Sequence, residues 1–389
     1  MPPQLSPPPN AIPRPPHQRP AVKSRSGCEQ CKRRKVKCDE RQPTCSRCIA
    51  RRETCTGNFQ CDPWQVERPW ISHTRTVTPV SVMENDALRH WYAKACLNMA
   101  IFHPPVNPLS HDLSVWLVHS RALRHTLECV AEAHREYFRP GRLGRALEIR
   151  GRAIISLHSE LARIRTAEQS SPYKHAVLLR TAVLSSMILC VSSSWLDPTT
   201  VDVGIEFLSG AKGLIEMLAA SGHLDDPLSF YALGLFLYWM AFSSYLVPSD
   251  MPVVQASPSI LDALTKPPFD TCVHPVTGIS ATLCPLIAEA GLYYRRTVDL
   301  HARDPALVTD LTQRLLFWQP PASCPDQPQL VQLAEGYRHL GLIMLCQAQS
   351  ITDEDVNNGV ILEHVFAVME LLQHIPQQDP LLNWFRLSR

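Results

Sequence analysis

The chain has 389 residues, of which 45% are hydrophobic and 19% are charged. This composition is typical of a globular protein with a large buried core, and it excludes a chain that is disordered throughout. The formal net charge of +2 hides an asymmetry, because residues 1–55 hold 13 Lys and Arg against 4 Asp and Glu, while the remainder is acidic. A basic head on an acidic body predicts an anionic partner, nucleic acid or membrane, for the head alone.

Residues 1–23 begin the chain with a proline-rich segment, in which nine of the first 20 residues are Pro. Proline removes backbone donors and the segment has no apolar face to bury, so we expect a disordered, partly polyproline arm. No apolar signal segment is readable before the cysteines that follow, which indicates a reducing compartment. Clustered cysteines in such a compartment favour metal binding or catalysis over disulfides.

Residues 24–58 carry six of the 14 cysteines at a regular spacing. They are Cys28, Cys31, Cys38, Cys45, Cys48 and Cys55. The pattern C-x2-C-x6-C occurs twice, and each C-x2-C pair can hold a tetrahedral Zn²⁺ through two thiolates. Two separate sites need eight ligands, so six thiolates suffice for two ions only if two of them bridge. A mononuclear zinc ribbon would leave two thiols unused, and a three-disulfide knot would need an oxidising compartment.

The cysteine segment lacks the residues of a hydrophobic core. Between positions 28 and 55, Val36 and Ile49 are the only large aliphatic residues. So small a unit cannot fold by burying apolar surface, and metal binding must supply its folding free energy. Thiolates close every coordination position, which predicts a structural metal without an open site for catalytic water.

The two half-repeats and the basic run between Cys31 and Cys38 resemble the fungal zinc-cluster DNA-binding domain, the binuclear Zn₂Cys₆ type of fungal transcription factors. The resemblance covers Cys28 to Cys55 and implies two structural Zn²⁺. It implies that Cys28 and Cys45 bridge the ions, that Cys31 and Cys38 complete one site, and that Cys48 and Cys55 complete the other. It also implies a nuclear protein that binds double-stranded DNA and acts with the transcription machinery on RNA polymerase II genes, with a metabolic gene set as a candidate target.

Basic side chains follow both C-x2-C pairs. The candidate DNA contacts are Lys32, Arg33, Arg34, Lys35, Lys37, Arg47, Arg51 and Arg52. Lys and Arg can donate to guanine O6 and N7 in the major groove or neutralise phosphates. The resemblance implies that Arg34 and Lys35 read a CGG-type triplet, Lys35 foremost, and that the later arginines contact phosphates. Taken alone, the basic run also fits a nuclear-localisation signal or a solvated surface.

Residues 59–83 form a polar linker without sustained apolar heptads, so no dimerising coiled coil is expected there. From 84 to 389, apolar residues recur at three- and four-residue steps and strand-like alternation is rare. This pattern predicts an all-α domain with many packed helices. The predicted helices cover roughly 83–99, 117–131, 141–166, 173–193, 201–221, 228–246, 280–300, 304–318, 328–349 and 354–374.

The uncharged run between Pro227 and Pro248 is long enough to span a bilayer. Acidic residues flank it, no nearby Lys or Arg anchors it, and serines and tyrosines interrupt it, all of which favour a central core helix and no membrane partner.

The stretch from Phe207 to Leu218 resembles a recurring segment of the all-helical regulatory domain that accompanies such zinc clusters. Its apolar stripe is expected to be core, and Gly210 and Gly213 would allow close helix approach. No P-loop, dinucleotide-binding, nucleophile-elbow or zinc-protease motif occurs, so no enzymatic activity is expected. The alternatives are an enzyme or a small-molecule sensor that the zinc cluster targets to DNA. The helical domain is the expected source of a homodimer, with monomeric binding as the other route.

Overall fold

The computed structural model describes residues 28–39, 41, 44–55, 85–104, 107–136, 142–166, 172–196, 203–224, 226–270, 272–321, 328–352 and 358–374. The chain divides into two compact units, Met1–Gln65 and Val66–Arg389. The expectations for the proline-rich arm at 1–23 and for the linker at 59–83 lie outside the described residues.

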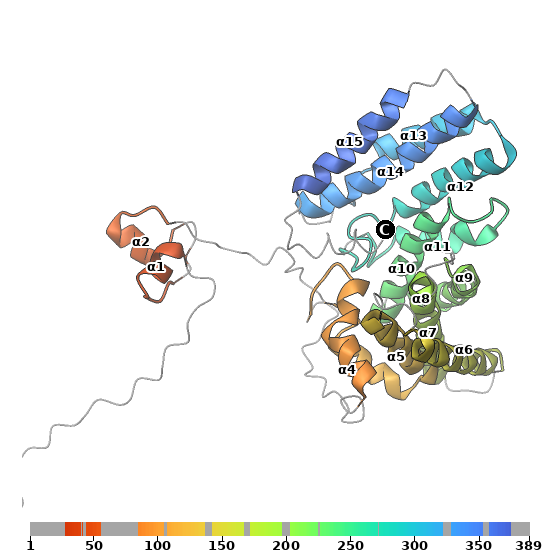
Figure 1. Cartoon of the computed structure of the whole chain (residues 1–389), viewed down its shortest axis with the longest axis horizontal. Helices are drawn as coiled ribbons and strands as arrows, with labels where there is room; N and C mark the ends of the chain where they lie inside the picture. Colours follow the sequence, from red (N-terminus) through yellow and green to blue (C-terminus); the bar gives the residue numbers. More distant parts are fainter. Residues whose placement is uncertain are drawn as a thin grey trace, which may run out of the picture. The chain divides into compact units, whose positions relative to one another are not determined.

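The first unit contains two short helices, α1 (Glu29–Arg33) and α2 (Ser46–Arg51), which pack on each other (Figure 1). A cysteine precedes each helix as its N-cap residue, Cys28 for α1 and Cys45 for α2. The buried residues of this unit are cysteines, while Val36 and Ile49 are exposed. The cysteines therefore occupy the place that a hydrophobic core takes in a larger domain.

In the described part of the second unit, helices are joined by turns and loops, and the strand-like pairing is limited to one isolated antiparallel bridge between His274 and Gly278. Its α-helices are α4 (Asp86–Ala93), α5 (Arg121–Glu136), α6 (Gly144–Arg165), α7 (Pro172–Val191), α8 (Ser193–Leu196), α9 (Ile205–Ala220), α10 (Pro227–Ser243), α11 (Pro258–Leu264), α12 (Cys284–Leu300), α13 (Pro305–Phe317), α14 (Pro328–Thr352) and α15 (Asn358–His374). Two longer 3₁₀-helices span Ala95–Met99 and His111–Val118. The predicted all-α class is confirmed.

Two predicted helices start or end differently. The run expected at 83–99 breaks at Lys94, where φ is −142° and a 3₁₀-helix takes over. The run expected at 117–131 begins only at Arg121, because the Ser120 hydroxyl accepts the amide N–H of Leu123, 2.9 Å away, in the manner of an N-cap. Helix α11 was not predicted, although a serine followed by Pro258 is a signal for a helix start.

Helices α7 and α10 form the centre of the second unit and are buried on nearly all sides. Helix α10 corresponds to the uncharged run of the sequence and packs against α7, α9 and α12, so its interpretation as a core helix agrees with its burial. Among the described helices, α7 alone has the length and apolar composition to cross a bilayer, and 78% of its apolar window is buried inside the domain.

The glycines predicted to allow close helix packing, Gly210 and Gly213, do not do so. Another glycine, Gly234, does. Gly210 and Gly213 lie on the exposed face of α9, where a side-chain Cβ would meet no atom within 4 Å, so the expected close approach there is wrong. The apolar stripe of α9 faces inward, as predicted, which turns both glycines outward. The close approach occurs instead at Gly234 of α10, where the ring of His274 occupies the space of a side chain.

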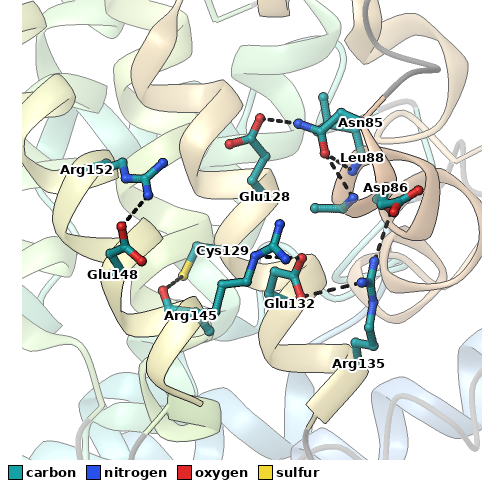
Figure 2. A network of polar contacts seen from close by, with 12 residues as sticks. Asn85, Asp86, Leu88, Glu128, Cys129, Glu132, Arg135, Arg145, Glu148 and Arg152 are labelled. Carbon is teal, nitrogen blue, oxygen red and sulfur yellow. Dashed lines mark hydrogen bonds and ion pairs between the residues drawn. The ribbon is translucent and has the colours of Figure 1, made fainter. Parts of the chain in front are cut away.

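A polar network joins the first helices of the second unit (Figure 2). The Asn85 side chain accepts the amide N–H groups of Ala87 and Leu88 at 2.9 and 3.2 Å, which caps α4, and its amide donates to Glu128 of α5 at 2.8 Å. Farther along α5, the buried Glu132 lies 3.6 Å from two arginines, Arg135 of the same helix and Arg145 of α6. These contacts fix α4 and α6 against α5.

Candidate metal centre and nucleic-acid interface

The six predicted cysteines come together between α1 and α2. Five of them are buried, and the half-buried Cys55 packs against the other five. The sulfurs of Cys28, Cys31, Cys45 and Cys48 all lie within 4.8 Å of one another, and the Cys38 and Cys45 sulfurs lie within the same distance of each other. Residues up to 27 apart in the sequence therefore converge on one small volume.

Individual sulfur–sulfur distances match a tetrahedral zinc–thiolate centre. The Sγ atoms of Cys28 and Cys45 are 3.8 Å apart, those of Cys28 and Cys48 are 3.7 Å apart, and those of Cys31 and Cys45 are 3.8 Å apart. A Zn–S bond of about 2.3 Å gives an edge of about 3.8 Å between two sulfurs of a tetrahedron. The donor set therefore fits Zn²⁺ in both chemistry and spacing.

Burial and local hydrogen bonding perturb the thiols of this cluster. Burial, together with hydrogen bonds involving Cys45 and Cys28, raises the pKa of the Cys48 thiol to about 12. Burial likewise raises the pKa of Cys31, because a charged thiolate loses its hydration there. Zinc binds the thiolate form, so such a thiol must release its proton as the metal enters, and zinc affinity rises with pH.

The two half-repeats also share their backbone geometry. Each short helix is followed by a residue in the left-handed region, Lys35 (φ 56°) after α1 and Arg52 (φ 53°) after α2. In each half the next amide donates to the carbonyl of the second cysteine at 3.1 Å, Val36 to Cys31 and Glu53 to Cys48. The chain is thereby turned so that the third cysteine of each half can return to the cluster.

The basic side chains predicted to contact DNA lie next to the cysteines in the sequence. Seven of them are exposed, namely Lys32, Arg33, Lys35, Lys37, Arg47, Arg51 and Arg52. Arg34 is the exception, because it is half-buried and forms an ion pair with Glu53. Residues 32–37 place four exposed cations along one short stretch, so the first half-repeat concentrates more positive charge than the second.

Two acidic residues of the site were not predicted. Glu53 links the two half-repeats through its ion pair with Arg34, and Asp39 accepts the amide N–H of Ser46, 3.1 Å away, at the start of α2. The hydrogen bond from Ser46 lowers the pKa of Asp39, so this carboxylate stays charged where it meets the positive end of the helix. Both contacts cross between half-repeats, and no local sequence signal marks them.

The chain matches two families of known proteins. Residues 87–384 match the fungal specific transcription factor domain, and residues 26–64 match the fungal Zn(2)-Cys(6) binuclear cluster domain. No solved structure matches the chain.

Two proteins of Candida albicans share shorter stretches with the chain. Sterol uptake control protein 2 is 32% identical over 107 residues, which cover 23% of this chain and 15% of that protein. White-opaque regulator 2 is 46% identical over 35 residues, which cover 9% of this chain and 8% of that protein. Each similarity thus spans a small part of the relative's length. The family match over 87–384 covers most of the chain, and together with the cysteine centre it shows that the chain belongs to the fungal specific transcription factor domain family and carries a fungal Zn(2)-Cys(6) binuclear cluster domain.

Proposed function

We propose that this protein is a nuclear, sequence-specific DNA-binding transcription factor that acts on RNA polymerase II genes. One observation carries the proposal: six cysteines converge, three pairs of their sulfurs have the spacing of a zinc–thiolate tetrahedron, and exposed Lys and Arg side chains follow them along the chain. A buried thiolate cluster without a hydrophobic core holds a fold together, and the cations around it offer donors to an anionic polymer.

The cluster holds two Zn²⁺ in this proposal, and all six cysteines are ligands. Cys28 and Cys45 are the bridging ligands, which the sulfur distances support, because these two sulfurs lie beside each other and each also lies beside a further cysteine, Cys48 or Cys31. Cys38 then completes the site of Cys31, and Cys55 completes the site of Cys48. The ions cross-link the two half-repeats and present α1 with its basic residues in a fixed orientation.

Lys35 is the proposed reader of a guanine in a CGG-type triplet. It is exposed at the end of α1, whereas the neighbouring Arg34 is held by Glu53. Among the described residues no ion pair holds the Lys35 ammonium group, so it can donate to guanine O6 and N7 in the major groove without first breaking one. The remaining exposed cations then contact phosphates, which contributes affinity and salt dependence but no base preference.

A pair of matched variants tests this division of roles. Lys35→Gly and Arg52→Gly both remove a cation from a left-handed position that glycine adopts without strain, so the cluster keeps its fold. Lys35→Gly should cost about 1–3 kcal/mol on a CGG-containing duplex and bring its affinity close to that for a scrambled duplex. Arg52→Gly should weaken both duplexes equally and lower the salt slope by about one unit. An unchanged preference in Lys35→Gly would contradict the base-reading role.

The helical unit is the proposed source of a homodimer and of contacts with the transcription machinery. One triplet offers few base contacts against a genome of competing sites, while a dimer doubles them and fixes the half-site spacing. Sedimentation of the full chain with and without a zinc chelator tests this assignment. A dimer that persists in chelator places the contact in the helical unit, and dissociation by chelator would place it with the zinc cluster.

A further inference from the structure

The helical unit contains a cavity of about 300 Å³ between α11, α12 and α13. The cavity is half open to solvent, and its walls combine polar side chains with leucines, namely Leu261 from α11, Leu292 from α12, and Leu307 and Leu311 from α13. This volume lies at the lower end of the range for small-molecule sites. The cavity therefore suits a compact ligand with an apolar part, in contrast to a bulky one.

The charged side chains at the cavity are not paired one to one, because a single arginine takes two carboxylates. Glu289 of α12 is neutralised by Arg314 of α13, whose guanidinium donates to both carboxylate oxygens at 2.7 and 3.0 Å. Asp310 contacts the same guanidinium at 3.1 Å. Arg296, two helical turns after Glu289 on the same face of α12, also lines the cavity; it is exposed at the cavity's mouth and has no ion-pair partner among the described residues.

We propose that this cavity binds a small amphipathic carboxylate, a molecule with one carboxylate group and a short apolar tail. Arg296 is the side chain that binds the carboxylate, because a guanidinium donates two parallel hydrogen bonds to the two oxygens of such a group. The tail lies against the leucines of α11 and α13, where it displaces water from apolar surface. The proposal goes beyond DNA binding and does not depend on it.

The position of the cavity gives such a ligand an effect on the fold. Helix α11 has only 7 residues and forms one wall, so a bound tail adds apolar contacts across three helices. A ligand that binds the folded unit alone stabilises it by mass action. The carboxylate should therefore raise the unfolding temperature of the helical unit in a saturable way.

Sodium octanoate is a suitable probe, with 1-octanol and octylamine as controls of equal tail length. The zinc-loaded full chain is titrated by calorimetry, and its thermal unfolding is followed with each compound. We expect saturable binding and a rise in melting temperature with octanoate, and neither with the alcohol nor the amine. Equal effects from octanoate and octanol would overturn the proposal, because they would show binding of the tail without recognition of the carboxylate.

Two variants locate the binding. Arg296→Gln should weaken octanoate about tenfold or more, the loss expected for a charged hydrogen-bond partner. The matched control is Arg295→Gln, since this neighbour pairs with Asp299 2.6 Å away and does not line the cavity. Leu261→Trp should abolish binding by filling the cavity while Arg296 stays in place. Unchanged octanoate binding in either Arg296→Gln or Leu261→Trp would place the site elsewhere and refute the proposal.

Discussion

The two units of the chain bury different chemistry at their centres. In the first unit the buried side chains are cysteines, and the aliphatic Val36 and Ile49 face solvent. In the second unit the centre is made of apolar helices, with α10 buried along almost its whole length. We therefore expect one unit to take its folding free energy from metal binding and the other from removal of apolar surface from water.

Because of this difference, the residues proposed to bind DNA lie in the small cysteine-rich unit, and most of the buried apolar surface lies in the helical unit. The cysteine-rich unit carries the exposed cations that DNA binding needs, and we expect it to unfold when metal is removed. We expect the helical unit not to share that dependence, because apolar packing, hydrogen-bonded caps and ion pairs hold its helices together. Conditions that change one unit should leave the other unchanged, and the following predictions test that independence, from the largest expected effect to the smallest.

Removal of zinc should unfold the first unit and leave the second unit folded. Structural zinc supplies on the order of 10 kcal/mol to such small units, more than their few other contacts can replace. Because α1 and α2 contain only 5 and 6 residues, chelation of the full chain should lower the helical circular dichroism slightly and leave the main thermal transition in place. DNA binding, measured by fluorescence anisotropy, should be lost.

The zinc count of the full chain sharpens this prediction. Elemental analysis should give two Zn²⁺ per chain, and a count of one would rule out the bridged cluster. Cys28→Ala should lose both ions, because a bridging sulfur serves both of them, whereas Cys55→Ala should retain part of the metal. Loss of the main thermal transition on chelation would show that the two units are coupled after all.

Overpacking should disrupt the helical unit without affecting zinc. A side chain at Gly234 would overlap the ring of His274, which is buried and held by three hydrogen bonds, so Gly234→Ala should cost about 3 kcal/mol or more. The control is Gly210→Ala, where nothing lies within 4 Å, and which should stabilise α9 by roughly 0.5–1 kcal/mol. Urea unfolding measures both. Equal effects of the two variants would contradict the packing shown by the structure.

The sequence indicated which cysteines converge more directly than it indicated how the helical core packs, and the reason is physical. Ligand spacing within C-x2-C is local, so the cysteine pattern is readable residue by residue. The ion pair between Arg34 and Glu53 joins the two half-repeats, and it depends on a convergence that only the folded cluster produces. In the helical unit, period and capping signals located most helices, but which glycine faces a neighbour depends on helix rotation and packing. For that reason the prediction of close packing at Gly210 is wrong, and the close packing at Gly234 could not be predicted from the sequence.

Acidification should weaken the helical unit through His274. Burial lowers the pKa of His274 to about 3, while a hydrogen bond to the Phe230 carbonyl opposes the shift. Its Nδ1 accepts amide N–H groups from Val276 and Thr277 at 2.9 and 3.3 Å, so a proton there would face two donors. The folded state thus binds fewer protons than the unfolded state, and the stabilisation present above about pH 6.5 is lost as the pH falls towards 3.

The expected loss between about pH 7 and about pH 5 is roughly 2 kcal/mol, measured by urea unfolding at each pH. His274→Gln carries no charge at any pH and should show a shallower pH dependence, although it is less stable at neutral pH. Burial also lowers the pKa of His90, His134 and His339, so these residues contribute to the same slope in both proteins. If the free energy of unfolding depended on pH equally in the wild type and the variant, His274 would not be the cause of the acid destabilisation.

The smallest effect is expected at the cap of α4 (Figure 2), where a single polar side chain stabilises a helix end of the second unit. Asn85→Ala removes the acceptor for two amide N–H groups and the donor to Glu128, and should cost about 1 kcal/mol without changing zinc content.

A second variant, Asn85→Asp, separates the contribution of the cap from that of the contact with Glu128. It keeps the capping acceptor but places a second carboxylate against Glu128, whose oxygen is 2.8 Å from the present amide nitrogen. Like charges at that distance repel, so this variant should be destabilised at neutral pH and recover as acid protonates one of the two carboxylates. If Asn85→Asp matched the wild type at neutral pH, the contact with Glu128 would contribute nothing and the cap alone would hold α4 against α5.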